Sequence, residues 1–347
     1  MSTIRVNLIT YRRPKLLPRA IDSLRAQTFQ DWTCEVQNGD PADGEPGRLL
    51  ASIGDTRFRL ALPPRRMGPV EAFNLVHQPA AEPWQSLLED DNWWEPGFLA
   101  GMLQAVAAHP EVELAWSNMR VWSERADGGW EDTGRCIWNL PAGTPARVFR
   151  WPQLAEFSDC LYSNGSMLLR SRAAGRLIMP VDISRDMIEQ GRERLMNFPI
   201  LLVPAPLANF AVTRQTMRST DHGGWGETQT LLGAAFLQCV PMSPGARAAL
   251  WAHRRSLRPR STATLFSAAL AQRDWSFLRH ATVADWTAFL RGALRRPGTM
   301  RRMIRAKRLH PETWRWLLEI TAARTAEARE RGFTVLTEDS VIDKQNP

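Results

Sequence analysis

Cysteine is scarce in this chain of 347 residues, and the few cysteines exclude several kinds of site. They are widely separated, and no two have the spacing of a metal-ligand pair or of a redox motif. They are Cys34, Cys136, Cys160 and Cys239. We therefore expect reduced thiols and a cytosolic protein.

Long apolar runs are also missing. No stretch of about 18 apolar residues is present, so the sequence predicts no transmembrane helix. The first residues enter a strand-like pattern without the apolar core of a signal peptide. The apolar fraction of 44% is ordinary for a folded protein, and the length suits one large domain with an appendage or two domains.

Acidic residues are scarce in residues 227–310. Residues 1–226 carry 24 basic and 26 acidic side chains, whereas residues 227–310 carry 15 basic and 3 acidic ones. The net charge of +8 therefore comes from the second region. This excess indicates a phosphate-rich or anionic-membrane partner, or else a solvated helical face.

Strand and helix patterns alternate along the first third of the chain. The periodicity predicts strands near 4–10, 32–36, 57–60, 84–88 and 112–121, and helices near 16–24, 70–77 and 98–106. Such alternation is typical of an α/β sheet with parallel strands. Residues 123–150 are rich in turn residues and predict loops.

The second half of the chain is mostly helical in pattern. A strand is predicted near 161–169, a helix from 182 to about 196, and a strand pair within 199–212. Five helices follow, near 228–239, 245–256, 261–271, 283–295 and 311–331. The last few residues have the composition of a disordered end.

Three acidic side chains follow the strand predicted at 84–88 directly. They are Glu89, Asp90 and Asp91. Neighbouring carboxylates repel one another, and a divalent cation would offset that repulsion. Hard cations such as Mg²⁺ and Mn²⁺ take carboxylate oxygens and leave room for substrate phosphates. The segment predicts a metal and diphosphate site, and the alternative is a solvated acidic turn.

Polar clusters follow two other predicted strands, at residues 10–12 and 38–40. In open α/β sheets, ligands bind beyond the carboxyl ends of the strands. The coincidence of the three clusters at 10–12, 38–40 and 89–91 predicts a single site at that edge of the sheet.

The first 220 or so residues resemble family 2 glycosyltransferases of the GT-A fold. Residues 6–14 resemble the first strand and nucleotide-binding turn of that family, and residues 20–29 resemble its next helix with a Ser-Leu…Gln-Thr ending. Residues 88–96 resemble its aspartate-rich metal motif with a trailing proline. The resemblance implies a GT-A-like mixed sheet flanked by helices at 1–226, and the helical pattern beyond it predicts a mostly helical domain at 227–347.

The resemblance also implies roles for individual residues. Asp91 is the expected metal ligand, with Glu89 and Asp90 beside it. Asp186 falls where the family carries its catalytic base, although an acid at a helix N-terminus is also favoured by the helix dipole.

Three parts of the pattern depart from the family. Gln37 and Asn38 stand where paired aspartates are usual, one of which binds the base, and Glu89 and Asn92 stand where the metal motif commonly has aspartates. Arg185 stands where a glutamate usually precedes the catalytic aspartate.

Contacts to the nucleotide sugar are expected from the strand ends and from a polar segment at 214–226. That segment is either a lid, with an arginine on the diphosphate and His222 near the metal, or a domain linker. We expect Asp40 to bind the ribose or the base of the nucleotide; the alternative is that it only stabilises the turn before Pro41. The expected contacts are Thr10, Tyr11, Arg12, Asn38, Asp40, Asn74, Asp90, Arg214 and Arg218. Trp93 and Trp94 are expected either to pack on the face of a sugar or to fill the core.

We therefore expect a metal-dependent, inverting transfer of sugar from a nucleotide-diphosphate donor, with Mn²⁺ or Mg²⁺. The acceptor is a glycan, a lipid carrier, a protein or a small molecule, and no nucleic acid partner is expected. The basic helices suit a phosphorylated or lipid-linked acceptor at the inner membrane face, a cover for the catalytic domain, or a homo-oligomer interface. Alternatives are a non-catalytic binding protein of the same fold and a nucleotidyltransferase, although the latter usually has a glycine-rich loop that this chain lacks.

Overall fold

The computed structural model describes residues 3–340 except 159, 161–163, 215–221 and 258–261. It divides into two compact units, each built from more than one stretch of the chain. The first comprises Met1–Arg150, Tyr162–Arg185 and Phe198–Thr216. The second comprises Trp151–Leu161, Asp186–Asn197 and Met217–Pro347. The two domains predicted from the sequence, a catalytic domain at 1–226 and a helical domain at 227–347, stay a prediction.

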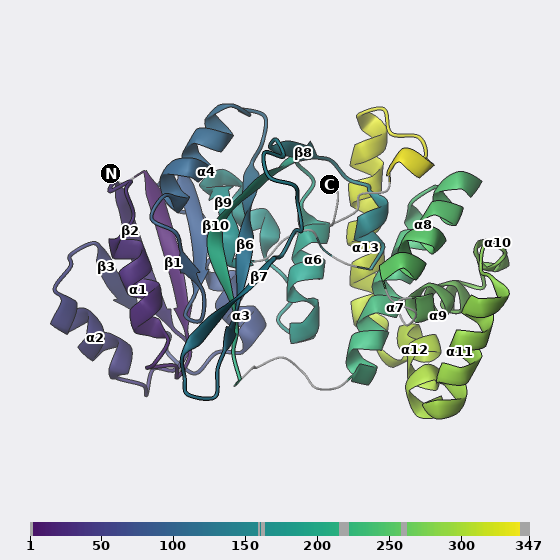
Figure 1. Ribbon diagram of the computed structural model, residues 1–347, viewed down its shortest axis with the longest axis horizontal. Helices are drawn as coiled ribbons and strands as arrows, with labels where there is room; N and C mark the ends of the chain where they lie inside the picture. The colour runs from purple at the N-terminus through teal and green to yellow at the C-terminus, as the bar shows by residue number, and fades with distance from the viewer. Residues whose placement is uncertain (1–2, 159, 161–163, 215–221, 258–261, 341–347) are drawn as a thin grey trace. The chain divides into compact units, whose positions relative to one another are not determined.

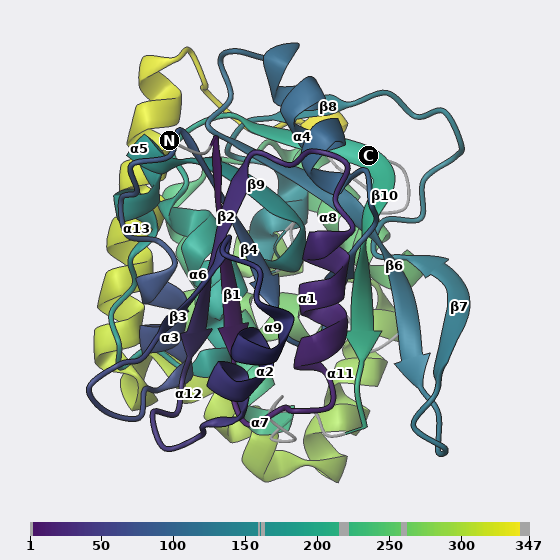
Figure 2. The same ribbon diagram turned by 90° about the vertical axis from the view of Figure 1, so that its left-hand side faces the viewer.

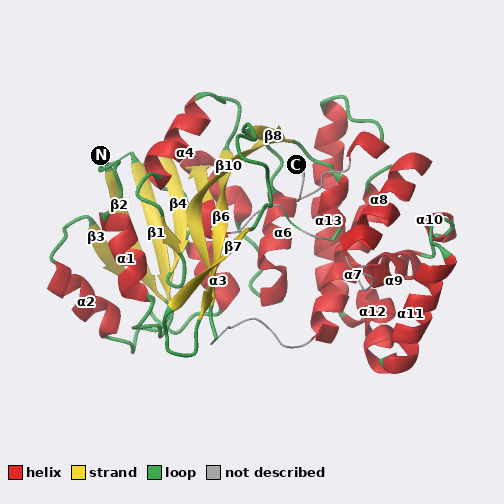
Figure 3. Cartoon of the chain, viewed as in Figure 1, coloured by secondary structure: helices red, strands yellow, loops and turns green. Residues whose placement is uncertain are grey.

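A single sheet organises the first unit (Figure 3). Within the described residues its order is β3-β2-β1-β4-β9-β6-β10-β5, with β7 beside β6 and β8 beside β10. The strands are β1 (Ile4–Thr10), β2 (Trp32–Asn38), β3 (Phe58–Ala61), β4 (Trp84–Glu89), β5 (Trp93–Trp94), β6 (Leu114–Glu124), β7 (Trp130–Cys136), β8 (Arg147–Phe149), β9 (Met167–Arg170) and β10 (Ile200–Val212).

Parallel pairing at the start of the chain brings three strand ends together. β1 lies parallel to both β2 and β4, and β2 lies parallel to β3. β9 is antiparallel to β4 and β6, so the sheet is mixed, as the GT-A resemblance implies. The loops after β1, β2 and β4 consequently leave the sheet at the same edge.

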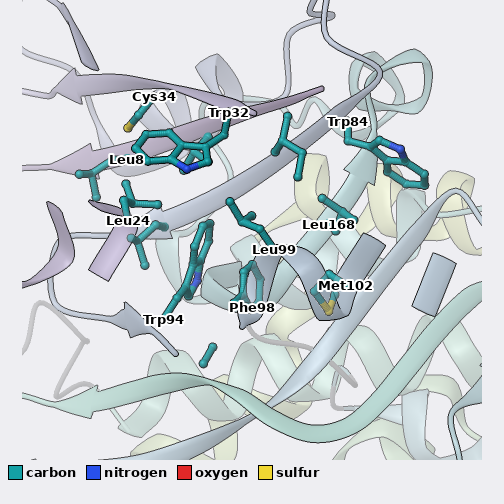
Figure 4. Packing of buried hydrophobic residues seen from close by; sticks show 14 of the residues in the cluster. Leu8, Leu24, Trp32, Cys34, Trp84, Trp94, Phe98, Leu99, Met102 and Leu168 are labelled. Carbon is teal, nitrogen blue, oxygen red and sulfur yellow. The ribbon is translucent and has the colours of Figure 1, made fainter. Parts of the chain in front are cut away.

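Helices cover this sheet through apolar stripes. In α1 (Leu17–Arg25), Leu17, Ala20, Ile21 and Leu24 are buried at helical spacing, and a proline occupies the first turn, where its missing N–H is harmless. α4 (Phe98–Ala107) packs into the same core, where Leu24, Trp94, Phe98 and Leu99 lie close together (Figure 4). The other helices of this unit are α2 (Glu45–Ile53), α3 (Pro69–Leu75) and α5 (Ser171–Ala174).

The second unit is helical (Figure 1). Its core joins Trp151, Phe157 and Phe236 to the helices that follow. Its helices are α6 (Ile188–Leu195), α7 (His222–Cys239), α8 (Pro244–Leu257), α9 (Thr262–Gln272), α10 (Trp275–Leu278), α11 (Val283–Arg295), α12 (Pro297–Leu309) and α13 (Pro311–Glu330). None of the described helices is long and apolar enough to cross a membrane.

Several sequence predictions fail. The strand pair predicted within 199–212 is wrong, because one strand, β10, runs through Pro204 and Pro206, and register shifts against β6 accommodate both prolines. The loop prediction for 123–150 misses β7 and β8. The helices α2, α5, α10 and α12 were not predicted, and the predicted disordered end lies mostly outside the described residues.

Candidate active site

Strand register places the polar clusters at 10–12 and 89–91 side by side. β1 and β4 are parallel neighbours, with Ile9 opposite Glu89, so the next residues, Thr10 and Asp90, leave the sheet together. The Thr10 hydroxyl donates a hydrogen bond to Asp90 Oδ2 over 2.9 Å, and the Tyr11 backbone N–H donates to the same oxygen over 3.1 Å. Asp90 is thereby buried and fixed by the turn that follows β1.

Two carboxylates converge on one cationic side chain, Arg13. Its Nη1 lies 3.5 Å from Asp90 Oδ1 and forms a closer ion pair with Asp91. Burial and the neighbouring Asp91 raise the pKa of Asp90 to about 7, and the Arg13 charge acts in the opposite direction. This corner of the sheet therefore favours the neutral form of Asp90 unless a positive charge lies beside it.

The carboxylates of the acidic segment suit a hard cation that also binds substrate. Among the described residues, no three acidic, histidine or cysteine side chains are arranged to hold a metal ion by themselves. Asp91 is 21% exposed in its side chain and can be reached from solvent, whereas the Glu89 carboxylate accepts a hydrogen bond from Asn92 over 2.9 Å. Magnesium is commonly held by one or two carboxylates plus substrate phosphates, and the residues here fit that pattern.

The loop after β2 is held by its own polar side chains. Asn38 is buried, donates to the carbonyl of Asp43 over 2.8 Å and accepts from the backbone N–H of Asp40 over 3.1 Å. Arg12 then ties this loop to the turn after β1, because its Nε donates to Asp40 Oδ2 over 2.5 Å. The Ala42 N–H and the Arg12 guanidinium lower the pKa of Asp40.

Tyr11 lies at the same edge with its hydroxyl buried and without a hydrogen-bond partner among the described residues. The guanidinium carbons of Arg12 and Arg66 lie 5.8 and 5.1 Å from its ring centroid. Gly39 leaves room for the ring, since a Cβ there would lie 3.3 Å from Tyr11 Cδ2. The turn thus presents an aromatic ring with two positive charges near it.

Asn74 and Arg214 have other partners. The Asn74 amide donates to the Met179 carbonyl over 2.7 Å and accepts from the Met179 N–H over 3.0 Å, so it fixes a backbone segment. Arg214 follows β10; its N–H donates to Glu124 over 2.8 Å, and its side chain donates to the Ala126 carbonyl over 3.3 Å. Their nucleotide-sugar contacts stay predictions.

The remaining predicted residues fall in or near the second unit. Asp186 lies in the 3-10 turn Arg185–Met187 that leads into α6, and it is the first residue of the stretch Asp186–Asn197 of the second unit. His222 is the first residue of α7, and its side chain lies outside the description. Arg218 lies outside the described residues. Their assigned roles stay predictions.

Arg13 and Arg19 are site residues that the sequence analysis missed. Arg19 stacks between Trp93 and Trp130, with its guanidinium carbon 3.8 and 3.9 Å from their ring centroids, and donates to the Asp91 carbonyl over 2.7 Å. Burial lowers the pKa of Arg19 to about 10. The only sequence signal was the cluster of basic residues directly after the first strand.

The two tryptophans of the acidic segment have separate roles. Trp93 holds Arg19, whereas Trp94 is buried, stacks on Phe98 at 4.1 Å and donates to the Gly165 carbonyl over 2.7 Å. For Trp94, the core-packing alternative is therefore correct.

Comparison with known proteins identifies the first unit. Residues 6–154 match the family model "Glycosyl transferase family 2". This stretch, which is less than half of the chain, is similar to glycosyl transferase family 2. The chain therefore carries a domain of the glycosyltransferase type, as its motifs implied.

Solved structures show the same fold over nearly the whole chain. Residues 1–349 of S. aureus TarS, in complex with UDP-GlcNAc, match with a TM-score of 0.53 and 10% identity, covering 95% of this chain and 92% of that one. The mannosyltransferase PcManGT from Pyrobaculum calidifontis, in complex with GDP-Man and Mn²⁺, matches with a TM-score of 0.50 and 14% identity, covering 96% and 87%. The fold is thus the GT-A type predicted from the sequence.

One curated relative matches over a shorter stretch. The uncharacterized protein y4gI of Sinorhizobium fredii is 27% identical over 107 residues, which are 30% of this chain and 12% of that protein. The chain therefore spans only a small part of the length of the curated relative that it matches.

Proposed function

We propose that this glycosyltransferase moves a sugar from a nucleotide-diphosphate donor to an acceptor hydroxyl, with inversion at the anomeric carbon and with the help of Mn²⁺ or Mg²⁺. The observation that carries the proposal is the convergence of Asp90 and Asp91 on Arg13, beside the turn after β1. Crowded carboxylates at the carboxyl end of parallel strands, with one of them open to solvent, suit a cation and a diphosphate.

The donor would lie along the strand ends. Asp91 would hold the cation, with Glu89 near it, and Arg12 and Asp40 would flank the nucleoside beside the Tyr11 ring. When bound, the divalent cation would neutralise charge on the departing diphosphate. The matched structures of TarS and PcManGT, solved with UDP-GlcNAc and with GDP-Man and Mn²⁺, support a donor of this class.

Asp186 is the proposed base. Its carboxylate would take the proton of the acceptor hydroxyl as that oxygen bonds to the anomeric carbon and the bond to the diphosphate breaks. An aspartate is a weak base at neutral pH, since its ordinary pKa is about 3.9. Positioning must therefore supply much of the rate, and removal of the carboxylate should cost about a hundredfold or more in turnover.

A donor panel tests the proposal. UDP- and GDP-sugars are incubated with the protein and Mn²⁺ or Mg²⁺, and release of the nucleoside diphosphate is measured. At least one donor should be turned over, and Asp91→Asn and Asp186→Asn should each lose about a hundredfold or more of the rate. Asp22→Asn is the matched control, because Asp22 is 68% exposed in its side chain and lies on α1, where it forms an ion pair with Arg25.

The rival functions give different results in the same panel. Tight donor binding without turnover of any sugar, in the presence of varied hydroxyl acceptors, would favour the non-catalytic binding protein. Release of pyrophosphate from a nucleoside triphosphate and a sugar phosphate would favour the nucleotidyltransferase. Full activity in Asp91→Asn would remove the metal assignment.

A further inference from the structure

The helices α11 and α12 carry a dense positive charge, and the acidic residue of α11, Asp285, is buried and pairs with Arg255. Residues 286–311 contain eight basic side chains and no acidic one. Two of the eight have partners: Arg302 pairs with Glu227, and Lys307 donates to Gln272 over 3.1 Å. The other six form no hydrogen bond, ion pair or ring contact within the described part of the chain, and they are Arg291, Arg295, Arg296, Arg301, Arg305 and Arg308.

An apolar stripe runs beside these arginines on α11. Val283, Leu290 and Leu294 are 84%, 53% and 83% exposed, and with Thr287 they recur every three or four residues, on one face of the helix. The opposite face is anchored, since Phe289 is buried and stacks on Phe266 at 4.5 Å. The exposed leucines are therefore not core residues of the second unit.

A cavity of about 520 Å³ opens next to the same arginines. Phe289, Met300 and Met303 supply apolar walls, and Arg291, Arg295 and Arg296 also line it. A pocket that joins an apolar floor to free guanidinium groups suits an anionic headgroup with hydrocarbon attached.

We propose that α11 and α12 form a docking surface for an anionic lipid membrane. An interfacial helix combines exposed apolar side chains with flanking arginines in this way, and each basic residue adds attraction to acidic lipid. The surface here consists of Val283, Leu290, Leu294, Ile304, Leu309 and the six free arginines. The inference does not depend on the proposed sugar transfer.

Two other occupants fit the surface less well. A second copy of the same face would bring free arginines together, and residues 286–311 offer no carboxylate to neutralise them. A soluble polyanion such as nucleic acid would satisfy the arginines but would leave Leu290 and Leu294 in water. Only a membrane surface matches both the charge and the exposed apolar stripe.

Vesicle sedimentation of the full chain, without donor or metal, tests the proposal. Vesicles of 30% phosphatidylglycerol in phosphatidylcholine should bind the protein, and vesicles of phosphatidylcholine alone should not. The double variant Arg291→Gln/Arg295→Gln should bind roughly thirtyfold more weakly. Leu290→Ser/Leu294→Ser should also lose about tenfold or more, although the overall charge is unchanged.

Matched controls separate this surface from general charge and folding effects. Arg59→Gln/Arg135→Gln removes two exposed arginines from the first unit, and Leu62→Ser removes a leucine that is 57% exposed there. Both controls should bind within about threefold of the unchanged protein, and thermal melting should show all variants folded. Equal loss in the controls, equal binding to neutral vesicles, or no vesicle binding would overturn the proposal. A dimer that depends on Leu290 and Leu294, without vesicle binding, would overturn the proposal in favour of a second copy of this face. Binding to duplex DNA but not to vesicles would overturn it in favour of a soluble polyanion.

Discussion

Arg13 supplies the counter-charge for two aspartates, so its removal should lower the free energy of unfolding. With Arg13→Met, Asp90 and Asp91 lose their shared partner in a corner where Asp90 is almost fully buried. We expect the free energy of unfolding at pH 7 to fall by about 2 kcal/mol, less than for a wholly buried pair because Arg13 is 17% exposed. Urea unfolding measures this loss.

Arg25→Met is the control for that prediction. Arg25 pairs with Asp22 at 3.4 Å on an exposed face of α1, where ion pairs contribute about 0.5 kcal/mol or less. Similar losses in the two variants would show that the Asp90 and Asp91 corner needs no counter-charge.

Gly165 lies against the acidic segment and leaves no room for a side chain. A Cβ there would lie 2.9 Å from Asn92 Nδ2 and 3.5 Å from Glu89 Oε2. Asn92 has little freedom to move, since it also accepts from the Ala211 N–H over 3.0 Å. Gly165→Ala should therefore displace Asn92 and Glu89, lower turnover by about tenfold and cost about 1–2 kcal/mol.

Gly97→Ala provides the comparison, because a Cβ at Gly97 meets nothing within 4 Å and its φ is negative. Donor turnover and thermal melting of the two variants test the prediction. If Gly165→Ala behaves like Gly97→Ala in both measurements, the segment at 164–166 does not constrain the acidic residues.

Asp55 gives the fold a pH dependence of known sign. The Arg57 side chain donates to it over 2.7 and 3.1 Å, and this lowers the pKa of Asp55. A lowered folded pKa contributes stability above the unfolded value of about 3.9, and this stability is lost as the pH falls through the folded value. Between pH 5 and pH 2 the unchanged protein should lose about 1 kcal/mol more than Asp55→Asn. Urea unfolding curves that fall in parallel would contradict this.

Gln27 joins the end of α1 to the segment that follows β5. Its amide donates to the carbonyls of Ser23 and Glu95 over 3.0 and 2.8 Å, and it accepts from the Leu99 N–H over 3.0 Å. Because Gln27 is buried, Gln27→Ala leaves these backbone groups unpaired and should cost about 2–3 kcal/mol.

Thr28→Ala is the control for Gln27, since Thr28 is exposed and its hydroxyl donates a single hydrogen bond to the Pro96 carbonyl. Its loss should stay below about 1 kcal/mol. Thermal melting that shows the same loss for both variants would mean that Gln27 does not connect the two segments.

Elements with a clear local pattern were predictable. β1, β4, α1 and α4 follow from apolar periodicity that is visible within each segment. α12 was missed because its buried positions are few among arginines, and β7 because its side chains are largely exposed and polar. β10 was divided by its prolines, since only pairing with β6 shows how a register shift absorbs them.

The site was predictable only where neighbours in sequence are neighbours in space. Glu89, Asp90 and Asp91 were found because they are consecutive. The contacts of Arg13 and Arg19 with Asp91 join residues more than 70 positions apart, so they depend on the pairing of β1 with β4. The bonds of Asn74 to Met179 depend likewise on long-range packing.

The chain as a whole separates two kinds of charge. The first unit holds the acidic corner at the carboxyl ends of its parallel strands, and the basic excess lies in the helices of the second unit. Figure 2 shows the face of the first unit on which α1 lies along the strands of the sheet. We infer that the two regions serve different partners, a nucleotide sugar and an anionic surface.

Titration calorimetry of Mn²⁺ with UDP or GDP tests the acidic corner most directly. The unchanged protein and Asp22→Asn should bind one of these nucleotides much more tightly with Mn²⁺ than without it. Asp91→Asn should lose at least tenfold of that metal-dependent gain while keeping its melting temperature. Nucleotide binding that is independent of Mn²⁺, or equal in Asp91→Asn and Asp22→Asn, would contradict a cation held at Asp91.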